Sequence, residues 1–374
     1  PTSPYLNALK TDGIEPLKFV SQSLRDYDLL VFDDAIHSAF EPFVFYADML
    51  RNSTNANPID YVFIEVFSIA SNPLIEKFLT DTMKNRETLH KVFQDDFSGM
   101  GWRYSTYIDL LEAIWDINRN DRTDHKIKVI GVDQPVYWEA IHTKKEYEIF
   151  SESLTARDYF MFKVISGYMN DFNSGKKGIF LTNTRHANIR LKNKEGNLIW
   201  NCATFFHSWH PGKSLSVRFH NYNLFVNKSI ASEQVSVQGM ENYEYKWVKM
   251  DNGNWDSAFE QYGNKAVAIK INNTAFGRTP YIGNLMLATR HDQTMQDAYD
   301  AIVFLKPLNQ LHFSPTTDFF YTVEFKKELK RRLAILYEGR IEELFKEFGV
   351  KSIAECIDLI AKPEPLRPNA LQDN

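Results

Sequence analysis

The sequence predicts a single α/β domain over residues 1–374, with three layers: helices, a mixed and mainly parallel β-sheet, and helices again. Short apolar runs rich in β-branched and aromatic residues recur at wide spacing, and longer stretches with helical periodicity separate them. The 374 residues are 44% hydrophobic and 14% aromatic, which is enough apolar surface to cover both faces of such a sheet.

The apolar runs are the predicted strands, since each is bounded by polar residues or glycine, as expected of strands buried on both faces. They cover residues 29–32, 61–67, 127–132, 178–181 and 300–305. The stretches between them place apolar residues at i, i+3 or i+4, and i+7, the pattern of a helix with one face against a sheet. These predicted helices cover residues 40–50, 73–85, 104–118 and 156–172.

The region from residue 215 to 271 has a different pattern. Alternating apolar and polar residues, separated by turns such as Asp-Asn-Gly-Asn, predict an added antiparallel segment rather than further β–α units. Its strands are expected at 214–219, 235–237, 243–248 and 266–271. Helix formers with opposite charges predict a helical extension at about 322–360, divided into 322–348 and 351–360. Three prolines after residue 361 predict frayed chain there.

Composition and charge exclude several classes of protein. The 43 Lys and Arg against 48 Asp and Glu give a net charge of −5 without long blocks of one sign, so no nucleic-acid partner is expected. Cys202 and Cys356 are too few and too far apart for a disulfide framework or a zinc knuckle. No run approaches the ~20 apolar residues of a membrane span. The N-terminus has no signal-peptide pattern; if a leader has been removed before Pro1, the protein is secreted or periplasmic.

Polar residues stand where the predicted strands end. From the first strand to the fourth they are Asp33, Asp34 and His37, then Glu65, then Asp133, then Asn183 and His186. Ligands of open parallel sheets bind outside the carboxyl ends of the strands. We therefore expect His37, Glu65 and His186 to converge in one cleft.

Glu65 is the most unusual of these residues. It lies inside an apolar run, where an ionised carboxylate is costly unless a cation or hydrogen-bond donors compensate it. The expected partner is His37, His186 or an arginine, and a purely structural contact is the alternative to a catalytic one. For Asp33 and Asp133, a cap or turn at the start of the following helix is the more ordinary expectation.

Two further features point to binding. His207 and His210 lie three residues apart in a predicted loop, a spacing that can share a metal ion, but a loop with two solvated histidines fits equally well. Arg157 opens a predicted helix, where the helix dipole disfavours a cation. It is expected either to face an anionic group in the cleft or to pair with a neighbouring acid at the surface.

In their order along the chain, these motifs resemble those of the erythromycin esterase-like family. The resemblance covers roughly residues 28–305 and extends to the wider superfamily of haem-binding ChaN-like proteins and Tiki/TraB-type metalloproteases. The matching segments are Asp34-Ala35-Ile36-His37, Phe63-Ile64-Glu65, the strand ending Gly131-Val132-Asp133, Arg157-Asp158 with Met161, Asn183 to His186, and Tyr299-Asp300-Ala301. The resemblance implies a site in which His37, the histidine after the first strand, activates water for ester hydrolysis.

The sequence departs from the family motifs at four positions. Asp33 stands where the family has glycine and Asp34 where it has glutamate. Asn183 stands where the family has the first histidine of its second motif, and Tyr46 where a helix arginine is expected. Because His37, His186 and the second-strand glutamate Glu65 are kept, the resemblance still implies hydrolysis. Cleavage of macrolide esters is expected to be poor.

The resulting hypothesis is a hydrolase that acts on an ester or related bond of a small-molecule substrate. His37 acts as general base, Glu65 orients it or stabilises its charge, and His186 or Arg157 stabilises the oxyanion. The expected substrate-binding residues are Asp34, Arg157, Asn183, His207 and His210. One alternative is a non-catalytic binding or sensing protein on the same fold. The other is a Tiki-type hydrolase whose two histidines and glutamate hold a divalent metal ion as cofactor.

Overall fold

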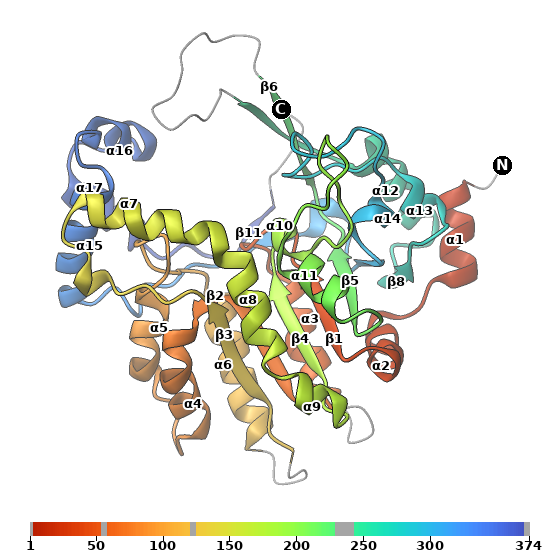
Figure 1. Ribbon diagram of the computed structural model, residues 1–374, viewed down its shortest axis with the longest axis horizontal. Coiled ribbons are helices and arrows are strands. Elements are labelled where there is room, and N and C mark those ends of the chain that lie inside the picture. Colours follow the sequence, from red (N-terminus) through yellow and green to blue (C-terminus); the bar gives the residue numbers. More distant parts are fainter. Residues whose placement is uncertain (1–2, 54–57, 120–124, 229–242, 370–374) are drawn as a thin grey trace. The chain divides into compact units, whose positions relative to one another are not determined.

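The computed structural model describes residues 3–53, 58–119, 125–228 and 243–369, and its main feature is a seven-stranded sheet flanked by helices (Figure 1). In spatial order the strands are β3 (Lys128–Asp133), β2 (Tyr61–Ser68), β4 (Gly178–Thr182), β1 (Leu29–Asp33), β5 (Ser214–Phe219), β9 (Ala301–Phe304) and β8 (Val267–Lys270). β1 and β5, β2 and β3, and β5 and β9 pair in parallel, whereas β8 and β9 are antiparallel. The predicted α/β fold with a mixed, mainly parallel sheet is confirmed.

The chain divides into two compact units. Unit 1 comprises Pro1–Pro42, Ile179–His312 and Pro368–Asn374, and unit 2 comprises Phe43–Gly178 and Phe313–Arg367. Unit 2 therefore includes the predicted helical extension. A single domain over the whole chain stays a prediction.

In unit 1, burial explains the apolar runs. Every residue of β1, β5 and β9 is buried, as required of strands that helices cover on both faces. β1 and β5 are in register from Leu29 opposite Ser214 to Asp33 opposite Arg218. The register thus places two charged residues side by side at the carboxyl end of the sheet.

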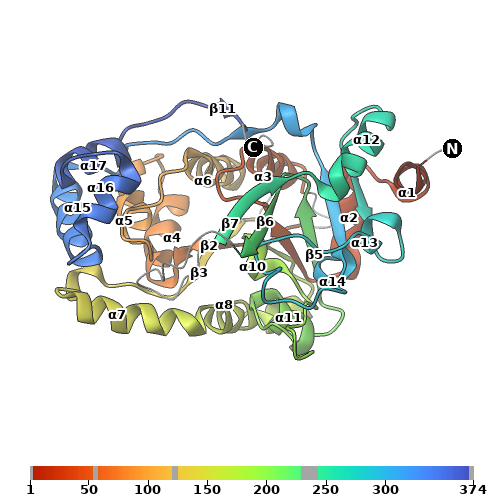
Figure 2. The same ribbon diagram turned by 90° about the horizontal axis from the view of Figure 1, so that it is seen from above.

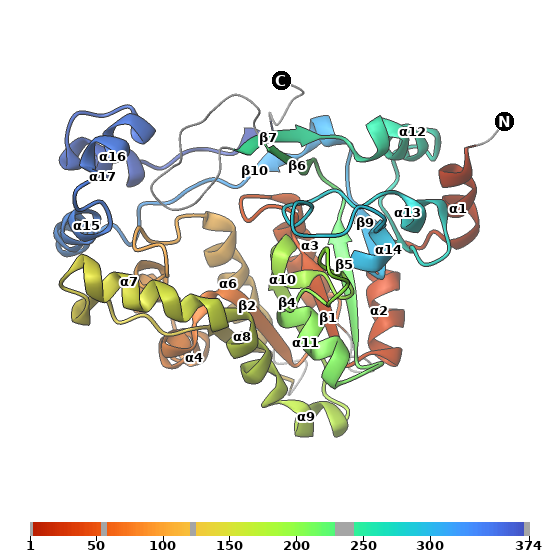
Figure 3. The same cartoon turned by 45° about the horizontal axis from the view of Figure 1, so that its top comes forward.

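The helices of unit 1 cover these strands. Figure 2 shows α2 on one side of β5, and α10 and α11 on the other. Figure 3 shows α1 beside α12 and α13. The bounds are α1 (Pro4–Asp12), α2 (Pro16–Asp26), α10 (Thr184–Ala187), α11 (Cys202–Trp209), α12 (Asn254–Gln261), α13 (Ala275–Arg278) and α14 (Met295–Ala298). Two small sheets lie outside the main one: β6 (Asn223–Lys228) with β7 (Tyr243–Val248), and β10 (His312–Phe313) with β11 (Arg367–Pro368).

Unit 2 builds the same layers around β2 and β3. Figure 2 shows α8 on one face of these strands, and α4, α5 and α6 on the other. The bounds are α3 (Glu41–Arg51), α4 (Asn72–Thr80), α5 (His90–Gln94), α6 (Ser105–Asn118), α7 (Lys144–Ser153), α8 (Arg157–Ser166), α9 (Met169–Asn173), α15 (Val323–Leu336), α16 (Ile341–Phe348) and α17 (Ile353–Ile360). None of the helices in the described ranges is long and apolar enough to cross a membrane.

Several predicted elements need correction. The strand expected at 214–219 is β5, but it is parallel to β1 and β9 inside the main sheet. The helix expected over 156–172 is divided into α8 and α9 with Gly167 between them, because glycine is a poor helix former. The helix expected over 322–348 is divided into α15 and α16 around Gly339, whose φ of 74° interrupts it. The strand expected at 235–237 lies outside the described residues.

Candidate functional site at the end of strand β1

The chain turns sharply where β1 ends. Ala35 has a φ of 65°, in the left-handed region that residues with a side chain rarely adopt. Its N–H donates to Oδ1 of Asp33 at 2.8 Å, and the N–H of Asp34 donates to the carbonyl of Thr182 at 3.1 Å. Such strain persists only where the surroundings fix the backbone, and it is frequent at functional sites. The two acids of this turn have different partners.

Asp33 is the centre of a buried hydrogen-bonded cluster. Its Oδ2 accepts hydrogen bonds from Nη1 of Arg218 and from the hydroxyl of Tyr299, each at 2.6 Å. Arg218 also donates to the Tyr299 oxygen at 3.0 Å and to Oδ1 of Asn223 at 2.8 Å. Asp33 is 0% exposed and Arg218 is 4% exposed, so the two charges neutralise each other inside the protein.

The pKa shifts in this cluster favour a structural role. Burial by itself lowers the pKa of Arg218, but Asp33, Tyr299 and Tyr281 together raise that pKa above its usual value. Burial, followed by the charge of Asp33, raises the pKa of Tyr299 well above 10. Both side chains therefore keep their protons near neutral pH. The turn role expected for Asp33 is present. Arg218 was not among the predicted site residues, although a charged residue within an apolar run is the same signal that marked Glu65.

Asp34 pairs with a histidine that reaches the surface. Its Oδ2 lies 3.5 Å from Nδ1 of His37, and its Oδ1 accepts a hydrogen bond from Nδ2 of Asn183 at 2.9 Å. The side chain of Asp34 is 3% exposed and that of His37 is 26% exposed. Burial raises the pKa of Asp34 above its usual range, and His37 partly opposes the shift. The structure thus brings together three of the predicted site residues.

A series of hydrogen-bonded polar side chains extends from Asn183. The hydroxyl of Thr184 donates to Oδ1 of Asn183 at 2.9 Å, and Nδ2 of Asn284 donates to Oγ1 of Thr184 at 2.7 Å. Oδ1 of Asn284 is buried and accepts no hydrogen bond within the described residues. Because an unpaired buried acceptor costs free energy, it is a candidate contact for a ligand. His186, 2% exposed, follows in the same helix as Thr184.

Glu65 lies in unit 2, where an arginine is its partner. Nη2 of Arg157 donates to Oε1 of Glu65 and to Oδ2 of Asp133, each at 3.0 Å, and Nε donates to Oδ1 of Asp133 at 2.7 Å. Of the partners expected for Glu65, the arginine is thus confirmed. The β2–β3 register shifts directly after Ile64, an irregularity that is common beside functional side chains. The convergence of Glu65 with the two histidines of unit 1 stays a prediction.

In the Arg157 cluster, one guanidinium donates to two carboxylates. Burial by itself lowers the pKa of Arg157, but Glu65 and Asp133 together raise it. Burial raises the pKa of Asp133, and Arg157 opposes that shift. Arg157 is 8% exposed, so of the two roles expected for it, facing buried anionic groups fits better than pairing at the surface.

The two histidines of the predicted loop lie on a helix instead. His207 is in α11 and His210 is its C-cap residue. The helix starts at Cys202, where the side chain of Asn201 accepts a hydrogen bond from the N–H of Thr204. Burial, followed by the charge of Arg190, lowers the pKa of His207. Within the described residues, no group of three or more His, Cys, Asp or Glu side chains is placed to hold a metal ion. A role of this pair in substrate binding stays a prediction.

Comparisons with solved structures agree with the fold. A protein from Bacillus cereus matches with a TM-score of 0.51 and 12% identity, over 83% of this chain and 100% of its own. A succinoglycan biosynthesis protein matches with a TM-score of 0.50 and 9% identity, over 81% of this chain and 96% of its own. A mutant of the erythromycin esterase EreC in its open conformation matches with a TM-score of 0.51 and 10% identity, over 81% of this chain and 96% of its own. No protein-family model and no curated protein matches the sequence.

These identities are low, so the comparisons establish the fold. The protein is of the class of α/β proteins built on a seven-stranded mixed sheet with helices on its faces. Within that class, its fold is similar to that of erythromycin esterase EreC over most of both chains. The resemblance read from the sequence motifs is confirmed at this level.

Proposed function

We propose that the protein hydrolyses an ester or related bond of a small molecule at the carboxyl end of β1. The observation that carries the proposal is the pair of a partly exposed imidazole, His37, and a buried carboxylate, Asp34. The strained turn at Ala35 and the Asp33–Arg218 ion pair hold this pair in place. The fold shared with an erythromycin esterase supports the type of reaction.

His37 is the general base in this proposal. Because its Nδ1 faces Asp34, Nε2 is assigned to take a proton from water as the oxygen attacks the ester carbonyl. The carboxylate of Asp34 stabilises the imidazolium that forms and fixes the ring, as a buried aspartate does in a catalytic triad. The imidazolium then returns its proton to the leaving alcohol.

The neighbouring side chains supply positioning and polarity. Asn183 holds the Asp34 carboxylate, and the unpaired acceptor of Asn284 is assigned to a donor on the substrate. Arg157 already donates to two carboxylates in unit 2, so His186 is the preferred donor to the oxyanion. A direct action of Glu65 on His37 is kept as a separate prediction.

The substrate is expected to differ from a macrolide. Aspartate at position 34 is one methylene shorter than the family's glutamate, and a misplacement of ~1 Å can cost ~100-fold in rate. Asn183 cannot take up a proton, and Tyr46, in place of an arginine, is a buried neutral side chain. Erythromycin is therefore expected to be hydrolysed far more slowly than small activated esters.

The test uses p-nitrophenyl acetate and p-nitrophenyl butyrate with the full chain. His37→Asn is expected to lower kcat/KM by about 100-fold or more, because general-base catalysis typically contributes that much. The matched control is His125→Asn, since His125 is 25% exposed and its Nδ1 lies 3.7 Å from Asp60. This control is expected to keep kcat/KM within about twofold of the wild type.

Equal activity of the two variants would show that any turnover comes from an unspecific imidazole, and would overturn the proposal. A folded wild type that hydrolyses neither ester, with or without added divalent metal, would also overturn it and favour a binding or sensing protein. Activity that appears only with added metal would favour the metal-dependent alternative.

A further inference from the structure

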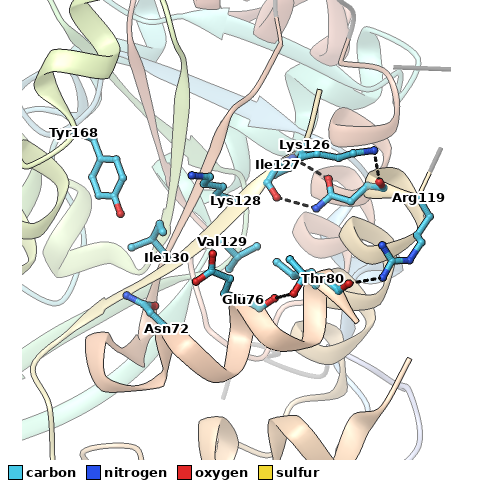
Figure 4. Close-up of a pocket in the computed structure, with 12 residues that line it drawn as sticks. Asn72, Glu76, Thr80, Arg119, Lys126, Ile127, Lys128, Val129, Ile130 and Tyr168 are labelled. Atoms are coloured by element: carbon cyan, nitrogen blue, oxygen red, sulfur yellow. Dashed lines mark hydrogen bonds between the residues drawn. The ribbon is translucent and has the colours of Figure 1, made fainter. Parts of the chain in front are cut away.

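The outer edge of β3 borders a pocket that the hydrolase site does not use. β3 is the first strand in the sheet order, so one of its edges has no neighbouring strand in the described sheet. A cavity of about 480 Å³ lies along this edge in unit 2, between α4, the end of α6 and Tyr168 (Figure 4). Its size is in the range of small-molecule sites.

Two asparagine side chains pair with the backbone of this edge. Asn118 accepts from the N–H of Ile127 at 2.8 Å and donates to its carbonyl at 2.9 Å. Asn72 accepts from the N–H of Gly131 at 2.7 Å and donates to its carbonyl at 3.2 Å. Each carboxamide thus takes the place of one residue of a missing neighbouring strand.

Val129 lies midway between these two capped residues. The N–H of Lys128 donates to the carbonyl of Asp60 on the β2 side at 2.8 Å. Backbone groups of successive strand residues point to opposite edges, so the N–H and carbonyl of Val129 point outward, into the pocket. Outside the β2–β3 ladder, no hydrogen bond found among the described residues involves either group. One donor and one acceptor of the backbone are therefore open at the pocket floor.

The two capped residues limit what can bind at Val129. A strand of several residues would also need the backbone groups of Ile127 and Gly131, which the asparagines occupy. A single primary carboxamide needs only one N–H and one carbonyl. The chain itself shows twice, at Asn72 and Asn118, that a primary carboxamide fits this strand edge.

We propose that this pocket binds a small molecule that carries a primary carboxamide on a flat apolar body, through paired hydrogen bonds to the backbone of Val129. Leu79, Ile130 and Tyr168 form the apolar lining for the body of the ligand. The Tyr168 ring is held by Tyr61, with 4.8 Å between the ring centroids.

The polar part of the lining sets a second requirement. Nε of Arg119 is buried and has no hydrogen-bond partner within the described residues. The guanidinium is fixed, because it stacks on Trp115 at 4.5 Å and donates to the carbonyl of Thr80 at 3.0 Å. An additional acceptor on the ligand would satisfy this donor.

Benzamide is the probe for the test, with methyl benzoate as its matched control, because the ester has the acceptor but not the donor. The full chain is labelled with ¹⁵N-valine, and the Val129 amide signal is assigned with Val129→Ile. Benzamide is expected to shift this signal saturably with a Kd of ~1 mM, ordinary for so small a ligand. Methyl benzoate is expected to bind about tenfold more weakly.

A second pair of variants tests the place of binding. Tyr168→Ala is expected to weaken benzamide binding about fivefold, because it removes the aromatic wall. Tyr137→Ala, at an exposed tyrosine of the same unit outside the pocket lining, is expected to leave it unchanged.

Three results would overturn the inference. The first is no saturable shift of the Val129 amide up to about 10 mM benzamide, tenfold above the expected Kd. The second is equal binding of the amide and the ester. The third is tighter binding of the extended peptide acetyl-Val-Ala-Val-N-methylamide, which would mean that the asparagines yield and that a partner strand is added instead.

Discussion

Each unit places a buried arginine against an aspartate that ends a strand, but the two arginines differ in the number of carboxylates to which they donate. In unit 1, Arg218 faces one carboxylate, Asp33, and two neutral partners, Tyr299 and Asn223. In unit 2, Arg157 is shared between the carboxylates of Asp133 and Glu65. The first cluster is balanced and fixed. In the second, burial and the charge of Glu65 raise the pKa of Asp133, so the stability of the fold depends on pH there.

The largest expected effect comes from removing either arginine. Arg157→Met is expected to lower the free energy of unfolding by about 3–5 kcal/mol, because two buried carboxylates lose the guanidinium that donates to both of them. Arg218→Met is expected to cost less, since Asp33 keeps the hydrogen bonds from Tyr299 and from the N–H of Ala35. Urea unfolding at neutral pH measures both, with the exposed Arg290→Met as control. Equal losses would remove the proposed difference between the clusters.

The next prediction concerns the pH dependence of unit 2. Burial, with a contribution from Glu65, raises the pKa of Asp133 in the folded state. A raised carboxyl pKa stabilises the fold at low pH, and this stabilisation is lost as the pH rises through the folded-state pKa. Glu65→Gln lowers that pKa, so the variant should lose less stability between about pH 4 and 7 than the wild type. It should be up to ~1 kcal/mol more stable at pH 7.

The matched variant in unit 1 should behave in the opposite way. Asp33→Asn leaves Arg218 buried without its carboxylate partner, and should destabilise the protein by about 3 kcal/mol or more at pH 7. Thermal unfolding at a series of pH values measures both variants. Destabilisation by Glu65→Gln at pH 7 would show that the buried charge of Arg157 requires both carboxylates, Glu65 and Asp133.

The Glu65→Gln variant also reports on catalysis, since a folded but inactive protein would support a catalytic role for Glu65.

Asp34→Asn separates stability from activity within unit 1. Because burial raises the pKa of Asp34, its ionisation destabilises the fold as the pH rises through that pKa. The amide is therefore expected to leave stability at pH 7 within about 0.5 kcal/mol of the wild type or above it. Ester hydrolysis should fall by about 10²–10⁴-fold, because the imidazolium loses its carboxylate. A stable variant with full activity would refute the role of Asp34 in the mechanism.

The smallest expected effect is at the strained turn. Ala35→Gly should stabilise the protein by up to ~1 kcal/mol, because glycine adopts a positive φ without a steric penalty. Ala39→Gly, at a buried alanine outside the positive-φ positions, should destabilise it by about 0.5–1 kcal/mol. Equal effects of the two substitutions on the melting temperature would mean that the turn stores no strain.

The strands could be predicted from the sequence because both faces of each are buried, which leaves a continuous apolar run. The helices α1 and α2 were missed, although each starts with a proline after a capping side chain, Ser3 and Glu15. Among the site residues, Asp34, His37 and Asn183 follow strand ends and could be found there. Asn284 could not, because it comes from an irregular segment a hundred residues from Thr184, its partner.

The division of the chain into interleaved units has a consequence for its synthesis. Unit 1 lacks its middle segment until residue 312 has been made, and it also includes the buried Asn369, whose N–H donates to the carbonyl of Leu311 at 2.7 Å. Unit 2 is completed by Phe313–Arg367. Neither unit can therefore complete its fold before residue 312 has been translated. Until then, strands of the incomplete units lack part of their apolar cover, and transiently exposed apolar surface of this kind is prone to aggregation.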